Sequence, residues 1–76
     1  MWIKAQSSEL FNLNAIESLS LVAKDKSKAI VAMPSDKKDL NTRNGYVLFT
    51  GSAADCEITL AEIEAAIVGN VDFLEL

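Results

Sequence analysis

The chain of 76 residues contains no histidine and only one cysteine, and these shortages exclude most common catalytic and metal-binding chemistry. The single thiol, at Cys56, has no partner for a disulfide within the chain and no imidazole to activate it as a nucleophile. A structural zinc site requires several thiolate or imidazole ligands. We therefore expect a protein that is not an enzyme and that binds no metal and no cofactor.

Long hydrophobic runs are also missing. No apolar stretch approaches the ~20 residues that span a bilayer. The N-terminus lacks the basic segment and long apolar stretch of a secretory signal. An unpaired cysteine is typical of a reducing compartment. These absences predict a cytoplasmic protein with no membrane partner.

Positive charge is scarce outside one part of the chain. The net charge is −4, and six of the seven basic residues lie between Lys24 and Arg43. From position 51 onward six residues are acidic and none is basic. An acidic chain is not typical of nucleic-acid-binding proteins. Weak binding of a nucleic acid or another anionic ligand through the Lys24–Arg43 region therefore stays an alternative function.

Half of the residues are hydrophobic, which is enough for one small folded domain. Alternating apolar and polar residues predict four strands, at 1–6, 10–23, 28–33 and 46–50. Asn14 and Glu17 form a capping-box pattern, which predicts one helical turn that bends the second strand. Pro34 ends the third strand, and the polar segment 35–44 is expected to be a long, mobile hairpin loop.

A helical pattern follows the last of these strands. Ser52 with Asp55 three positions later is a capping pattern that predicts a helix over 53–68, and an apolar tail occupies 71–76. One face of this helix is expected to cover the sheet; it carries Cys56, Leu60, Ile63 and Ile67. Cys56 is therefore interpreted as a buried structural residue.

Short connections between strands favour antiparallel pairing. The predicted fold is therefore α+β: a four-stranded, bent antiparallel meander packed against one C-terminal helix, with the tail as a candidate fifth strand.

A second apolar stripe lies on the opposite side of the predicted helix. Two interpretations remain: the stripe pairs with a second copy, or its alanines are simply good helix formers on an exposed surface. The tail pairs along a sheet edge, in its own chain or a neighbour's, or it plugs the end of the core. Trp2 either covers an edge of the core or anchors an interface. The predicted interface residues are Ile58, Ala61, Ala65, Val68, Phe73 and Trp2.

Three short motifs carry a resemblance to known sequences: the opening Trp2-Ile3-Lys4, the corner Asn12-Leu13-Asn14 and the junction Phe49-Thr50-Gly51-Ser52. In these motifs the chain resembles a group of short, uncharacterised bacterial and phage-borne proteins. The resemblance covers most of the chain except the polar loop and the tail. It implies a small sheet with a C-terminal helix and no assigned activity.

The leading functional hypothesis from the sequence is a small, non-catalytic protein-interaction or self-assembling module. Its expected partner is a second copy, giving a homodimer, or another protein.

Overall fold

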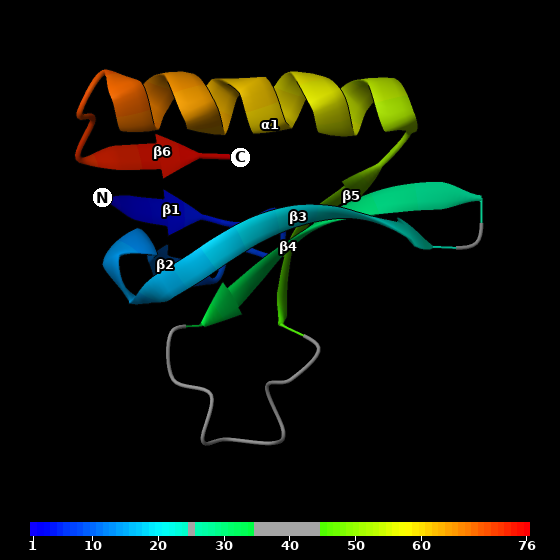
Figure 1. The fold of residues 1–76 in the computed structure, drawn as a ribbon, viewed down its shortest axis with the longest axis horizontal. Helices are drawn as coiled ribbons and strands as arrows, with labels where there is room; N and C mark the ends of the chain where they lie inside the picture. Colours follow the sequence, from blue (N-terminus) through cyan, green and yellow to red (C-terminus); the bar gives the residue numbers. More distant parts are fainter. Residues whose placement is uncertain (25, 35–44) are drawn as a thin grey trace.

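The computed structural model describes residues 1–24, 26–34 and 45–76, and for Lys24 it describes the backbone alone. The elements in chain order are β1 (Trp2–Lys4), β2 (Leu10–Asn12), the 3₁₀ turn η1 (Leu13–Ala15), β3 (Ile16–Lys24), β4 (Ser27–Pro34), β5 (Tyr46–Gly51), α1 (Ala53–Val68) and β6 (Phe73–Glu75). One helix packs against antiparallel strands, so the predicted α+β class is confirmed (Figure 1).

The strands form two three-stranded sheets instead of the single sheet that the sequence predicts. Sheet A has the order β2-β1-β6, and sheet B is an antiparallel meander in the order β3-β4-β5. The division falls at η1, where a helical turn was predicted. The side chain of Asn12, rather than Asn14, caps this turn by accepting a hydrogen bond from the Asn14 backbone N–H at 3.0 Å. Because the turn redirects the chain, the predicted strand at 10–23 is shared between the two sheets.

The apolar tail forms β6 and pairs within its own chain. It lies parallel to β1, with Trp2 opposite Phe73 and Lys4 opposite Glu75. Backbone bonds close both ends of the pair: the N–H of Trp2 donates to the Asp72 carbonyl at 2.8 Å, and the N–H of Leu76 donates to the Lys4 carbonyl at 2.9 Å. The parallel direction requires a long crossover, which α1 supplies.

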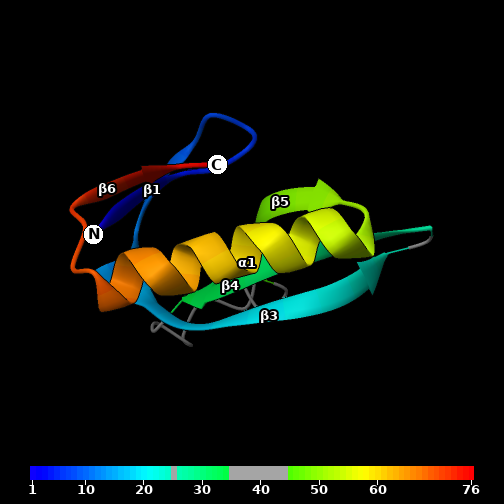
Figure 2. The same cartoon turned by 90° about the horizontal axis from the view of Figure 1, so that it is seen from above.

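The core lies between α1 and the two sheets. Viewed from above, α1 crosses sheet B over β4, sheet A lies on the β5 side, and β3 lies on the other side (Figure 2). The largest fully buried side chains are Ile3, Ile30, Leu48, Ile63 and Cys56. No helix in the described part of the chain has the length and apolarity needed to cross a bilayer.

The helix has the predicted bounds, and Ser52 caps it by accepting a hydrogen bond from the Asp55 N–H at 3.1 Å. Its covered face is rotated from the predicted one. Thr59 and Ala66 are buried, whereas Ile67 is 53% exposed, so the prediction that Ile67 covers the sheet is wrong. At the end of α1 the Val71 N–H donates to the Ala66 carbonyl at 3.0 Å, and the chain turns back to form β6.

Candidate interaction surfaces

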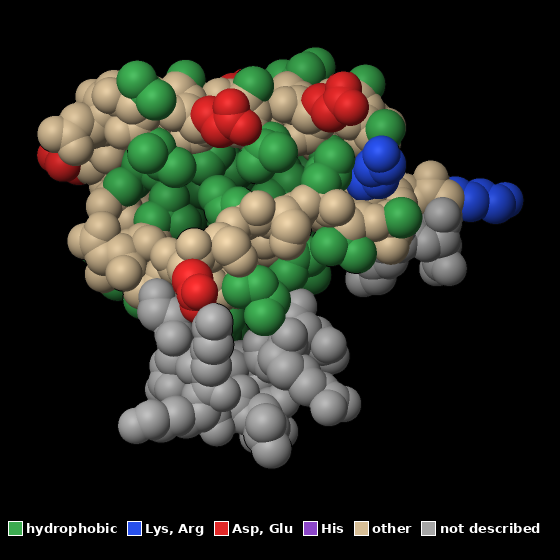
Figure 3. Space-filling model, in the orientation of Figure 1, with side chains coloured by type: hydrophobic (Ala, Val, Ile, Leu, Met, Phe, Trp, Pro, Cys, Tyr) green, Lys and Arg blue, Asp and Glu red, His purple; other side chains and the backbone are tan. Residues whose placement is uncertain are grey.

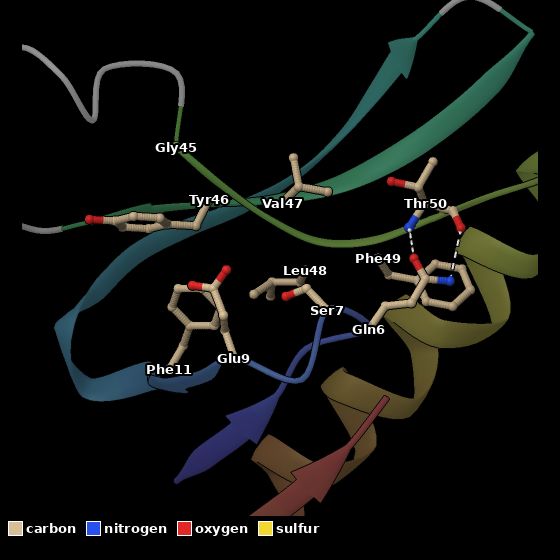
Figure 4. Close-up of a pocket in the computed structure, with 10 residues that line it drawn as sticks. All are labelled: Gln6, Ser7, Glu9, Phe11, Gly45, Tyr46, Val47, Leu48, Phe49 and Thr50. Atoms are coloured by element: carbon tan, nitrogen blue, oxygen red, sulfur yellow. Dashed lines mark hydrogen bonds between the residues drawn. The ribbon is translucent and has the colours of Figure 1, made fainter.

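A hollow of about 460 Å³ lies between the outer edge of β5 and the connection from β1 to β2 (Figure 4). At one end the rings of Phe11 and Tyr46 are 5.2 Å apart between centroids and inclined at 41°. At the other end lies Gln6. Two of the lining side chains are titratable, those of Glu9 and Tyr46. The lining also carries the hydroxyl groups of Ser7 and Thr50.

Gln6 closes the edge of β5 at this hollow. Its backbone N–H donates to the Leu48 carbonyl at 2.9 Å. Its side-chain amide donates to the Thr50 carbonyl at 3.2 Å and accepts from the Thr50 N–H at 3.0 Å (Figure 4). The amide thus binds Thr50 as a neighbouring strand residue would. These three bonds occupy groups that would otherwise be free to pair with another chain.

Cys56 is fully buried, and its thiol donates to the Lys28 carbonyl at 3.3 Å. The Gly51 carbonyl lies 3.8 Å from the sulfur. Burial confirms the structural interpretation of this cysteine. Among the residues that the structure describes, no three His, Cys, Asp or Glu side chains gather as a possible metal site.

The opposite edge of sheet B is β3, and no other strand of the described residues pairs along it. Alternate residues of an antiparallel strand direct their N–H and C=O groups to opposite sides. Lys24 pairs with Ser27 across a two-residue connection, so both direct their bonding groups into the hairpin. It follows that Leu19, Leu21 and Ala23 direct their N–H and C=O groups outward, away from β4. Between positions 18 and 23, no hydrogen bond from this outer side reaches another described residue.

An apolar groove of about 250 Å³ runs between β3 and α1. Its lining includes Leu13, Ile16, Leu19 and Ile67. The main contacts of α1 are with β4 and β5, so β3 is left on the uncovered side. Figure 3 shows hydrophobic side chains gathered in a band beneath α1, along the path of β3. The core is thus closed by sheet B, α1 and sheet A, and it opens to solvent along β3.

The four predicted interface residues of the helix all lie on its exposed side. Ile58 is 58% exposed and Val68 is 87% exposed, and Ala61 and Ala65 are exposed as well. This side has carboxylates on both flanks, Glu57 and Glu64 on one and Asp55 and Glu62 on the other. Two such faces brought together would oppose like charges, which disfavours pairing of α1 with a second α1.

Trp2 and Phe73 come together, as their register pairing on β1 and β6 requires. They are 48% and 49% exposed and lie on the face of sheet A that turns away from the buried Ile3. Leu10, opposite Lys4, shares this outer face. The two aromatic residues therefore form a surface patch on sheet A, separate from the exposed side of α1.

The β3 edge and its groove were not predicted. The sequence contains one signal of them: Ser18, Leu19, Ser20 and Leu21 alternate, and the strand has no proline and only one lysine, at its end. Such a strand lacks the features that usually block an edge. The alternation does not show which strand lies at an edge. The polar loop, and with it most of the predicted anionic-ligand region from Lys24 to Arg43, lies outside the described residues.

Comparison of the chain with protein-family models, with curated proteins and with solved structures gives no significant match.

Proposed function

We propose that this protein is a small, non-catalytic protein-interaction or self-assembling module that accepts a strand at the open edge of β3. The observation that carries the proposal is the outward direction of the Leu19, Leu21 and Ala23 backbone groups beside an apolar groove. Strand addition uses backbone hydrogen bonds for affinity and neighbouring apolar pockets for specificity. The β3 edge offers both on one side of the molecule.

The surface chemistry supports binding rather than catalysis as the role of this side. The groove is lined mainly by Leu13, Ile16, Leu19 and Ile67, which supply apolar contact area, together with Glu17 and Ser18. An added strand would cover these side chains and satisfy the outward backbone groups together. Burial of apolar area and pairing of backbone groups would then reinforce each other.

The proposal is tested with two measurements on the full chain. Light scattering on a sizing column, over a range of concentrations, reports self-association. NMR titration with a synthetic peptide of residues 16–24 as the probe reports strand addition directly. We expect a mass that rises with concentration, or peptide-induced shifts confined to the amides of β3 and the groove. A constant monomer mass together with unshifted β3 amides would overturn the proposal.

A further inference from the structure

We infer that the strand added at β3 is the β3 of a second copy, paired antiparallel about a two-fold axis at Ser20. This inference rests on the proposed function and names its partner. Ser20 is the midpoint of Ile16–Lys24, and this register pairs residues 18–22 with their symmetry mates, clear of the bulge between Ile16 and Ser18. A two-fold axis normal to the sheet makes such an interface self-complementary.

The direction of the backbone groups fits this register. Leu19 of one copy lies opposite Leu21 of the other, and both residues direct their N–H and C=O outward, as derived above. The two Leu19–Leu21 pairs therefore exchange hydrogen bonds on either side of the axis. Ser18 lies opposite Val22, and both side chains point away from the core face.

The apolar groove continues across the proposed interface. Leu19 and Leu21 pack against the core on the side that faces α1. The axis places the two helices on the same face of the joined sheet, each with its Ile67 flank toward the other. The two grooves then form one apolar layer between the helices. Glu57 and Glu64 border this layer on each helix, and each α1 lies over the β4 of its own copy, so the two helices do not pack directly on each other.

The closed edge of β5 decides how far assembly proceeds. In the joined sheet the strand order is β5-β4-β3-β3-β4-β5, so both outer edges are β5 strands whose Thr50 and Leu48 groups are bonded to Gln6. The bonds of Gln6 to the Leu48 carbonyl and to both backbone groups of Thr50 disfavour head-to-tail addition of a neighbour's β3 to β5, which is the arrangement that yields filaments. The geometry points to a closed dimer.

The test places charges on the axis. Ser20 is exposed, and in the dimer it faces its own symmetry mate. In Ser20→Lys, and separately in Ser20→Glu, like charges oppose each other across the axis. We expect each variant to raise the dimer Kd by about tenfold or more. An equimolar mixture of the two restores the dimer, because opposite charges then meet.

The matched control is Val47→Lys, which introduces the same charge on β5. Val47 lies in the same cross-strand row as Ser20, through Val31, and it is also exposed. Its substitution leaves the dimer mass unchanged. Circular dichroism confirms that the variants fold, and amide exchange supplies an independent readout: the Leu21 N–H exchanges more slowly as the concentration of the parent chain rises.

The outcomes separate this inference from the proposed function. One outcome is a dimer that both Ser20 variants leave unaffected but that Ile58→Glu or Trp2→Ser abolishes. This outcome would reject the β3 interface and would still support self-assembly through another surface. A chain that stays at 8.2 kDa at every concentration but still binds the 16–24 peptide rejects the second copy as partner and keeps strand addition. Association weakened by both variants and restored by mixing them supports the inference.

Discussion

The two edges of sheet B differ in how their outward backbone groups are satisfied. At β5, Gln6 supplies three hydrogen bonds from its backbone and side chain to Leu48 and Thr50. At β3, the outward groups of Leu19 and Leu21 reach no other described residue. One edge is closed by a residue far away in the chain, and the other stays open beside an apolar groove.

This difference shows that the fold protects its edges selectively. An open edge is a template for pairing with another chain, and proteins usually block edges that have no partner. Gln6 blocks β5 with its side-chain amide, which copies the donor and acceptor of a strand residue. The same chain places no proline, bulge or inward charge between positions 18 and 23 of β3. The contrast is the physical basis for assigning β3, rather than β5, as the site of association.

The largest expected effect comes from truncating the buried side chain of β5, the strand at the closed edge. Leu48 is 1% exposed, and its carbonyl receives the Gln6 N–H. Leu48→Ala should lower the free energy of unfolding by about 2–5 kcal/mol, because it leaves a cavity in the core. The control Val47→Ala removes a half-exposed side chain from the same strand and should cost well under half as much. Urea denaturation measures both, and equal losses would contradict the placement of Leu48 in the core.

A matched pair of prolines compares the two edges directly. In Thr50→Pro the N–H that donates to the Gln6 amide is lost, and the free energy of unfolding should fall by about 1–3 kcal/mol. In Ala23→Pro an outward N–H that reaches no other described residue is lost, and the free energy of unfolding of the monomer should change by only about 0.5 kcal/mol. Thermal unfolding of dilute protein gives both values. Similar losses at the two positions would mean that the β3 edge is already paired within the chain.

Opening the closed edge should have a smaller effect on stability and a visible effect on assembly. Gln6→Ala removes both side-chain bonds to Thr50 at an exposed site, which should cost about 1 kcal/mol. The freed β5 edge should then allow assemblies larger than those of the parent chain, seen by light scattering. Ser7→Ala, in the same connection, is the control and should alter neither property. If Gln6→Ala assembles like the parent chain, Gln6 does not block the addition of another strand to β5.

The smallest expected change in folding stability tests the groove. Ile67 lines the groove and Val68 does not, although both are exposed and adjacent on α1. Ile67→Ser and Val68→Ser should each change monomer stability by less than about 1 kcal/mol. Only Ile67→Ser should weaken association, by roughly tenfold in Kd, because it removes apolar area from the proposed interface. Equal effects on association would place the interface elsewhere.

Several features of the fold were predictable because their signals are local. The Ser52 cap and the apolar period define a helix whose bounds match the prediction. The strand segments and the turn at positions 13–15 follow from alternation and from turn-forming asparagines. Such patterns depend on residues a few positions apart, and each element retains them whatever it packs against.

The interface residues predicted from the sequence were only partly brought together. Trp2 and Phe73 meet on sheet A because β6 pairs in parallel with β1, and this pairing depends on the path of the chain after α1. The rotation of α1, which buries Ala66 and exposes Ile67, depends on how the helix packs against β4 and β5. Neither the Trp2–Phe73 pairing nor the rotation of α1 can be predicted from the periodicity of the residues involved.

The sequence by itself determined the elements, the apolar character of their faces and the absence of histidine- or disulfide-based chemistry. The tertiary structure alone decided which strand edges are closed. A strand's period records which of its faces is apolar, but the partner of its backbone depends on which distant segment lies beside it. Gln6 and Thr50 are 44 positions apart, and their contact exists only after the connection between β1 and β2 has been placed beside β5. The open β3 edge is the consequence of the same placement.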